Sequence, residues 1–267
     1  MQYIIGAAAG VIVGFSLGII GGGGSILAVP LMVYGVGVAD PHVAIGTSAL
    51  AVSVNAIAGL VSHARMGTVR WRVAGLFAAT GVAGAWVGSL AGKALAGPKL
   101  LACFGGLMLV VGALMLRSSS ARVRLEVEPR KISTPRLAAV GALTGTVSGF
   151  FGIGGGFLIV PGLMYAAHLP ILEAVGSALV AVAAFGLTTA ANYARSGWID
   201  WPLAAVFIGG GTLGGIAGTI LARRLSVVQG ALHRLYASVV FLGALYMIYR
   251  SATAGPFTWP FGAPRPL

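Results

Sequence analysis

The chain has 267 residues, of which 58% are hydrophobic and only 8% are charged, against roughly 25% charged residues in an ordinary soluble domain. This composition excludes an average soluble enzyme and is typical of an integral membrane protein. The net charge of +12 does not indicate nucleic acid, because that partner needs a soluble basic face and the basic residues here cluster in loops between apolar runs.

Long uncharged runs follow one another along the chain. A run of about 18 or more apolar residues can cross the roughly 30 Å hydrocarbon core of a bilayer as one helix. We predict an all-α integral membrane protein with about eight transmembrane helices, and we expect no signal peptide, because the N-terminus lacks a basic region before its first apolar segment. The clearest uncharged runs are 43–62, 73–92, 100–116, 174–194 and 202–222.

The first segment, Ile4 to Val38, carries four consecutive glycines in the stretch GIIGGGGSILAVP, Gly18 to Pro30. One helix over the whole segment would be about 52 Å long, which is too long for a single crossing. Glycine also costs a helix interior about 1 kcal/mol relative to alanine. We therefore predict a helix up to Ile20, an unwound glycine turn at membrane depth, and a short helix from Ser25 to about Val36.

The same design recurs in the second half of the chain. The stretch GFFGIGGGFLIVP, Gly149 to Pro161, aligns with the first glycine-rich stretch at a shift of 131 residues, and a shift of 130 aligns HARMGTVRW with YARSGWIDW. We predict two homologous halves, in each of which the first helix is broken at a glycine-rich turn and three plainer spans follow. The predicted parts are a first repeat at 1–117, a cytoplasmic linker at 118–135, a second repeat at 136–250 and an irregular tail at 251–267.

The loops predict an orientation through the positive-inside rule. Three arginines lie within 65–72 and six further basic residues within 117–136, whereas the loops around Asp40 and Glu173 contain no lysine or arginine. We expect the basic loops and both termini on the cytoplasmic side, and the other two loops outside. An even number of crossings in each half makes the repeats parallel, and a re-entrant segment in each half makes them inverted.

The paired breaks predict a binding site. In hydrocarbon, unwound backbone survives only where it lines a cavity or is buried in protein, and a helix that begins there offers its N–H groups and positive dipole end to an anion. Corresponding broken segments in two halves are a pointer to a transporter's substrate site. We predict substrate binding at the interface of the repeats by Gly21, Gly22, Gly23, Gly24, Ser25, Gly152, Gly154, Gly155 and Gly156.

Close helix packing is the alternative explanation for glycine in a membrane protein. It is weaker for the two clusters, because consecutive glycines do not form one helix face and each cluster precedes a proline at a fixed distance. Packing is favoured for the pairs with GxxxG spacing, which are Gly14 and Gly18, Gly84 and Gly88, Gly145 and Gly149, and Gly214 and Gly218.

Polar residues inside apolar spans are further candidates, because they are costly in lipid and tend to face the interior. Arg65 and Arg195 occupy the same repeat position at the inner ends of two spans, where they would either attract an anion into the pathway or enforce orientation. The polar residues added to the predicted substrate site are Thr47, Ser48, Asn55, Ser177 and Asn192.

No catalytic or metal-binding pattern stands out in the sequence. The glycine clusters lack the lysine of a P-loop, and no Ser-His-Asp or paired-carboxylate arrangement is visible. We expect His42 and His168 at the membrane interface and the single Cys103 as a small buried hydrophobic residue. The prediction is therefore a protein that is not an enzyme and has no cofactor and no metal.

The stretches GFSLGIIGGGGSILAVPLM with AIGTSAL, repeated as GTVSGFFGIGGGFLIVPGLM with AVGSALV, resemble the sulfite exporter TauE/SafE family of membrane permeases over nearly the whole chain. The resemblance implies a transporter of the bacterial inner membrane that exports sulfite or small organosulfonates such as sulfoacetate. The second repeat departs from the first at Ser25, where it has Gly156, and at Ser48, where it has Ala178, so the predicted site is asymmetric.

Several alternatives stay open for the function. They are an anion channel with a glycine-backbone filter, a permease of the same family for a different small anion, and a non-transporting membrane scaffold. Uniport or channel-like export is favoured, because no nucleotide-binding motif or intramembrane acid is evident and an inside-negative potential favours anion exit by about 2.3 kcal/mol per charge per 100 mV. The expected partners are a small anionic substrate and the lipid bilayer, without nucleic acid, and a homodimer is a further alternative.

Overall fold

The computed structural model describes residues 1–118, 133–154 and 156–224, and every regular element in these ranges is helical. Four of the described helices are long and apolar enough to cross a membrane, in keeping with the predicted all-α membrane protein. The elements are α1 (Gln2–Ile20), η1 (Gly21–Leu27), α2 (Ala28–Pro30), η2 (Leu31–Val36), α3 (Pro41–Arg65), α4 (Trp71–Ala94), α5 (Gly97–Ser118), α6 (Thr134–Phe151), α7 (Gly156–Ala167), α8 (Ile171–Ala194) and α9 (Trp201–Arg224).

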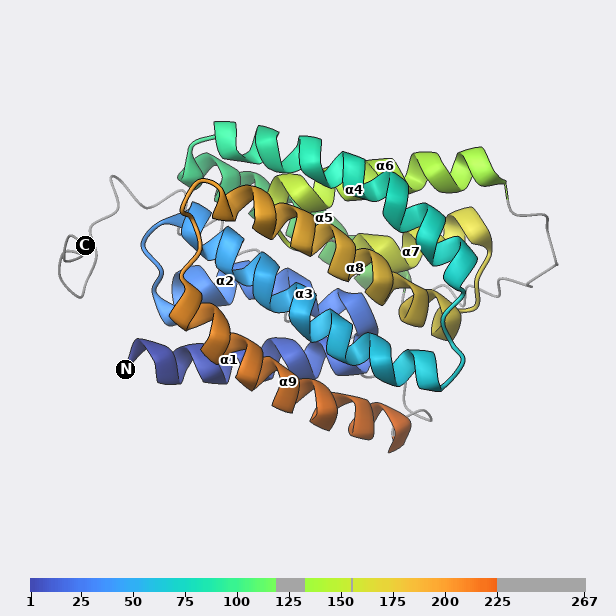
Figure 1. Cartoon of the computed structure of the whole chain (residues 1–267), viewed down its shortest axis with the longest axis horizontal. Helices are drawn as coiled ribbons and strands as arrows, with labels where there is room; N and C mark the ends of the chain where they lie inside the picture. Colours follow the sequence, from blue (N-terminus) through green and yellow to red (C-terminus); the bar gives the residue numbers. More distant parts are fainter. Residues whose placement is uncertain (119–132, 155, 225–267) are drawn as a thin grey trace.

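The helices lie side by side in layers (Figure 1). In this view α4 and α6 form one edge, α3 and α8 lie in the middle, and α1 and α9 form the opposite edge. Large side chains such as Phe77, Phe104 and Tyr193 are fully buried between the layers. The centre of the molecule is therefore packed mainly with apolar side chains.

The first break lies where the glycines predict it. Helix α1 ends at Ile20, and the chain continues as the 3-10 helix η1. It then folds back along α1, because η1, α2 and η2 all contact α1, and the backbone of Ser16 and Leu17 fills the space where Gly24 would carry a Cβ. The first segment is thus a hairpin of two pieces.

The predicted short helix from Ser25 to about Val36 is present, but its winding changes along its length, and the glycines before it lie in a 3-10 helix instead of the predicted unwound turn. The residues form a 3-10 turn, a single α-helical turn that ends at Pro30, and the π-helix Leu31–Val36. Proline has no N–H to donate and crowds the carbonyl of the preceding turn, and the rare π-helix occurs mostly as single turns of this kind within α-helices.

The second break is a true turn between two helices. Helix α6 ends at Phe151, Gly152 caps it with φ 67°, Gly154 has φ 64°, and α7 begins at Gly156. Only glycine adopts this left-handed backbone at little cost. Helices α6 and α7 contact each other, so this segment also folds back on itself.

Glycine contacts join α1 to α9 and α6 to α4. A Cβ on any of these glycines would collide with backbone of the partner helix, which confirms packing as the role of the four GxxxG pairs. The contacts advance in the same direction along both partners, so each pair of helices is parallel. They include Gly10 with Phe207, Gly14 with Gly211, Gly18 with Gly215, Gly141 with Phe77, Gly145 with Gly81, and Gly149 with Ala85.

Helices α3 and α8 run in opposite directions. Gly46, near the start of α3, lies against Trp198 beyond the end of α8, whereas Gly176, near the start of α8, lies against His63 near the end of α3. The two helices hold corresponding positions in the two predicted halves. Their opposite directions favour inverted repeats over parallel repeats. Each broken first segment folds back as a hairpin, so the number of membrane crossings in each predicted half changes from even to odd.

This arrangement corrects two sequence predictions. Arg70 donates from Nε and Nη2 to the two carboxylate oxygens of Glu173 at 2.7 and 2.6 Å, so the loop of Arg70 and the loop near Glu173 share one end of the molecule and do not face opposite sides. Arg65 and Arg195 follow antiparallel helices and therefore lie at opposite ends, not both at the inner end.

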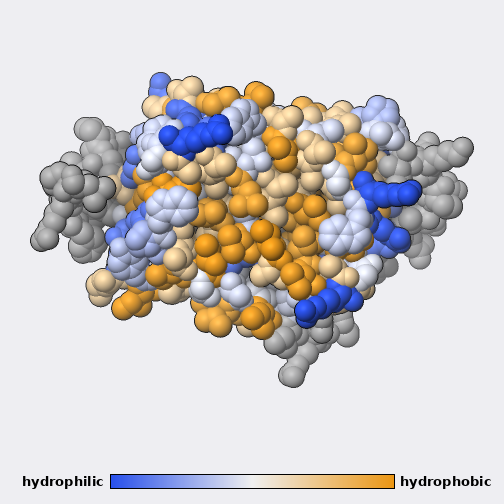
Figure 2. All heavy atoms as spheres, viewed as in Figure 1, coloured by the Kyte–Doolittle hydropathy of each residue, from blue (hydrophilic) through white to orange (hydrophobic). Residues whose placement is uncertain are grey.

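The surface shows where a bilayer would lie. Figure 2 shows apolar residues across the middle of the molecule and hydrophilic residues toward its ends. Trp71 and Trp201, which begin α4 and α9, are 58% and 62% exposed, as expected of interfacial aromatic residues. Cys103 is exposed on α5, so the prediction of a buried cysteine is wrong, because an apolar side chain in a membrane helix can face lipid as readily as the core.

Two buried hydroxyls hold the loops that lead into α9 and α4. Thr47 Oγ1 accepts a hydrogen bond from the backbone N–H of Asp200 at 3.0 Å, and Ser177 Oγ accepts one from the N–H of Arg70 at 2.9 Å. Thr47 and Ser177 are 130 positions apart, which is the shift that aligns the two predicted halves. Each predicted half therefore holds a loop of the other through a hydroxyl at the corresponding position. Their hydroxyls are already engaged by backbone.

We expect Ser177→Ala to lower the thermal stability of the purified protein, because an intramolecular hydrogen bond contributes about 1 kcal/mol and its N–H donor is left without this partner. Unfolding in detergent measures the effect. Thr188→Val is the control, because the Thr188 hydroxyl donates only within its own helix, to Ala184. An unchanged melting temperature together with a raised KM for a transported anion would contradict the structural role.

We also expect Gly84→Ala to destabilise the protein and Gly75→Ala to be neutral or stabilising. Both glycines lie in α4, but a Cβ on Gly84 would collide with Ala142 and Thr146 of α6, whereas a Cβ on Gly75 meets nothing. Overpacking costs about 1–3 kcal/mol, while alanine is the better helix former by about 1 kcal/mol. Equal melting temperatures for the two variants would show that the glycine contact does not hold α4 to α6.

Candidate functional site

The two broken segments meet at the centre of the molecule. Element η1 contacts α7 and α8, and α7 packs against α8 in turn. On the other side, Gly152 lies against Ile45 of α3, and a Cβ on Gly154 would lie 3.3 Å from both Val52 and Val182. We call η1, the turn at residues 152–154, the start of α7 at Gly156 and the facing parts of α3 and α8 the central junction.

Most of the predicted glycine site belongs to this junction. Gly21, Gly22 and Gly23 lie in η1, and Gly155 lies outside the described residues. The remaining members, Gly24, Ser25, Gly152, Gly154 and Gly156, are buried. The two clusters therefore come from opposite halves of the chain and lie in neighbouring elements, although their role in binding stays a prediction.

The predicted polar residues are not gathered in one place. Thr47 and Ser177 hold loops at opposite ends of the molecule, as described above. Ser48 donates to the carbonyl of Ile45 in its own helix at 3.1 Å. Only Asn55 and Asn192 take part in polar groups that involve a second helix.

Asn192 belongs to a polar cluster between α8 and the end of α4. Its Nδ2 donates to Ser89 Oγ at 2.7 Å, and Lys93 Nζ donates to its Oδ1 at 3.2 Å and its carbonyl at 3.1 Å. Lys93 Nζ also lies 5.6 Å from the centre of the Trp198 ring. The sequence analysis missed Lys93, although a cation in the last turn of a helix is a recognised stabilising feature.

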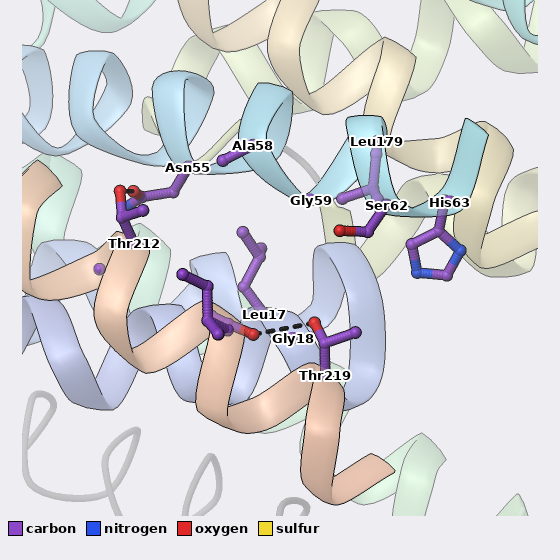
Figure 3. Close-up of a pocket in the computed structure, with 13 residues that line it drawn as sticks. Leu17, Gly18, Asn55, Ala58, Gly59, Ser62, His63, Leu179, Thr212 and Thr219 are labelled. Atoms are coloured by element: carbon purple, nitrogen blue, oxygen red, sulfur yellow. Dashed lines mark hydrogen bonds between the residues drawn. The ribbon is translucent and has the colours of Figure 1, made fainter. Parts of the chain in front are cut away.

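Asn55 belongs to a pocket of about 190 Å³ between α1, α3 and α9 (Figure 3). Asn55 and Thr212 point toward each other there, and Thr212 Oγ1 donates to Asn55 Oδ1 at 3.2 Å. Asn55 is 5% exposed, and its Nδ2 has no hydrogen-bond partner in the described structure. The other polar residues that line the pocket are Ser62, His63 and Thr219.

Helical spacing explains how the pocket forms and how it could have been found. Asn55, Gly59 and Ser62 recur at intervals of four and three, which places them on one face of α3. Thr212 and Thr219 are seven residues apart and share a face of α9 in the same way. The sequence analysis chose Asn55 as a polar residue inside an apolar span and missed the other members, because a single serine or threonine is ordinary in a glycine-rich membrane helix.

The described residues that line the pocket include no aspartate or glutamate. They offer the amide of Asn55, the hydroxyl of Ser62 and the imidazole of His63 as groups that can donate hydrogen bonds. The hydroxyls of Thr212 and Thr219 donate to the carbonyls of Ile208 and Gly215 in their own helix. Of the lining residues on α3, His63 lies nearest the end of the helix that carries Arg65 and is followed by the loop of Arg70. These donors suit a small solute that accepts hydrogen bonds, such as an oxyanion.

Comparison with known proteins agrees with this membrane architecture. A family model described as sulfite exporter TauE/SafE matches residues 6–247. Two proteins of Xylella fastidiosa, each named probable membrane transporter protein, are 50% identical over 249 residues, which cover 93% of this chain and 95% of each relative. The probable membrane transporter protein YunE of Bacillus subtilis is 25% identical over 246 residues, covering 84% of this chain and 90% of the relative.

No solved structure matches the chain. The family match nevertheless spans the region from α1 to beyond α9, including both glycine breaks and the pocket. The chain belongs to the sulfite exporter TauE/SafE family and is a membrane transporter.

Proposed function

We propose that this protein is a secondary transporter that exports small sulfur-containing anions, sulfite or organosulfonates such as sulfoacetate, across the bacterial inner membrane. Family membership supports the transport class, and the family's description makes sulfite the first anion to test. The observation that carries the proposal is the central junction, where two glycine-broken segments from the two halves of the chain meet between α3 and α8.

The junction has the properties of a substrate site in a transporter. Irregular backbone at membrane depth is tolerated only in protein or beside a cavity, and transporters place substrates at paired breaks between repeats. Helix α7 begins at the junction with Gly156, so its positive dipole end is available to an anion. Arg65 and Arg195 are exposed at opposite ends of the molecule and would attract anions at both mouths.

The packing favours a carrier over an open channel. Gly24, Ser25 and Ile153 are buried at the junction, so the described residues leave no wide passage past the glycines in this conformation. Two halves of opposite direction are suited to alternating access, in which one repeat rocks against the other around a fixed site. In this proposal the halves are residues 1–117 and 136–250, joined by the linker at 118–135.

The membrane potential is the proposed driving force. An inside-negative potential favours the exit of a monovalent anion by about 2.3 kcal/mol per 100 mV, so uniport alone can drive export. The three described acidic residues, Asp40, Glu173 and Asp200, lie at or beside helix starts and away from the junction glycines. The proposal therefore assigns no carboxylate to proton coupling.

Flux measurements in liposomes test the proposal. We expect purified protein to carry sulfite, thiosulfate or sulfoacetate faster than chloride, and an imposed potential to accelerate the flux. Gly154→Ala is expected to reduce the flux at least tenfold, because it forces a left-handed residue to carry a side chain between Val52 and Val182.

Gly197→Ala is the matched control. Gly197 has φ 72°, close to the 64° of Gly154, but a Cβ there meets nothing within 4 Å, so it introduces the same backbone strain away from the junction. Equal flux in both folded variants would contradict the junction site. Conductance far above carrier turnover would indicate a channel, and no flux of any anion would favour the scaffold alternative.

A further inference from the structure

We infer that the pocket between α1, α3 and α9 holds the transported anion, and that Asn55 both creates the space and donates to the ligand. The inference rests on the proposed transport function and goes beyond it, because it adds a binding position beside the central junction that the anion occupies on its path. It also places the site at only one of the two corresponding positions in the repeats, so that each chain binds one anion. Four observations support it.

The first observation is the unpartnered amide of Asn55. A buried donor without a partner costs about 1–3 kcal/mol, and such groups are uncommon in native proteins. Thr212 Oγ1 lies 2.9 Å from the carbonyl oxygen of Ile208 and 3.2 Å from Asn55 Oδ1, and its single hydrogen can serve one of these acceptors at a time. Asn55 Nδ2 lies against Gly211 and has no acceptor in the described structure. Since Nδ2 belongs to a pocket-lining side chain that is 95% buried, a bound ligand would complete the site.

The second observation is the size and chemistry of the pocket. Its volume of about 190 Å³ is below the roughly 300–1,000 Å³ of pockets for drug-sized ligands, so it suits a small solute. Thr212 lies beside Asn55 at one end of the pocket, and Ser62 and Thr219 line it about two helical turns further along α3 and α9 (Figure 3). Because the described lining includes no carboxylate, a small oxyanion is favoured over a cation.

The third observation is that a larger side chain occupies the position that corresponds to Asn55 in the second half of the chain. Counting 130 residues from Asn55 leads to Phe185, and counting 130 from Gly81 leads to Gly211. Asn55 lies against Gly211, and Phe185 lies against Gly81 in the same way. Phe185 is fully buried and stacks on Phe77 with ring centres 6.2 Å apart, so it fills the space that the shorter Asn55 leaves open.

The fourth observation is that the pocket adjoins the first break. Leu17 and Gly18 line the pocket near the end of α1, and the backbone of Leu17 lies directly against Gly24. A shift of η1 relative to α1 would therefore change the wall of the pocket. Binding in the pocket can in this way be coupled to a movement of the broken segment.

Substitution of Asn55 tests the assignment in the liposome assay. Asn55→Phe copies the residue that the fold already accepts at the counterpart position, and we expect it to abolish sulfur-anion flux. Asn55→Ala keeps the space but removes the donor, and we expect the apparent KM to rise about 10- to 100-fold, as for loss of a hydrogen bond to a charged group. Phe185→Leu is the control and should retain the KM of the unsubstituted protein.

A binding measurement separates the pocket from the transport function. In a Cys103→Ser background, Ser62→Cys places a thiol in the pocket for sulfonatoethyl methanethiosulfonate, and labelling is followed by mass spectrometry. We expect millimolar sulfoacetate to slow the labelling at least tenfold. We also expect Asn55→Phe to block the labelling, while Phe185→Leu leaves both the labelling and its protection unchanged.

The outcomes are distinguishable. Full flux in folded Asn55→Phe overturns the pocket assignment and leaves the proposed transport function standing. If the unsubstituted protein carries none of the sulfur anions, the proposed function fails, and protection of Ser62→Cys against labelling by sulfoacetate, phosphate or chloride then decides the pocket alone. Protection by one of these anions supports the pocket as an anion site, and protection by none overturns it.

Discussion

The constraint on which the rest of this structure depends is that unwound backbone inside a bilayer must be buried in protein. The chain departs from the α-helix at two such places, the 3-10 helix η1 and the turn at residues 152–154, and each is covered by elements from the other half of the chain. Element η1 packs on α7 and α8, while Gly152 and Gly154 pack on Ile45 and Val52 of α3. Each break is therefore buried against elements from the other half of the chain.

Glycine serves this architecture in two distinct ways. At Gly152 and Gly154 it allows left-handed backbone, which turns the chain at membrane depth. In α1, α4, α6 and α9 it allows helix backbones to touch, so that Gly14 meets Gly211 and Gly145 meets Gly81. The second use holds together the two helices of each outer layer, α1 with α9 and α4 with α6, and the first turns the chain from α6 back into α7. The pocket at Asn55 lies beside both kinds of glycine.

Much of this could be predicted from the sequence. Composition and uncharged runs indicated the membrane class, and the low helix propensity of glycine placed the first break at Ile20 and the second after Phe151. The relative direction of the predicted halves could not be predicted from the sequence. The positive-inside rule gives that direction only if the number of crossings in each half is known to be even or odd, and that number depends on whether a broken segment folds back. The ion pair of Arg70 with Glu173 joins two loops that the charge pattern had separated. The pocket was missed in part because it depends on three-dimensional asymmetry between Asn55 and Phe185.

The central claim is that the two halves run in opposite directions around the junction, and sided labelling of two cysteines tests it most directly. Arg65→Cys and Arg195→Cys, each in a Cys103→Ser background, mark corresponding positions at the ends of α3 and α8. In sealed membrane vesicles, a membrane-impermeant thiol reagent should label one of them from outside and the other only after permeabilisation. Labelling of both from the same side, as parallel repeats require, would contradict the account.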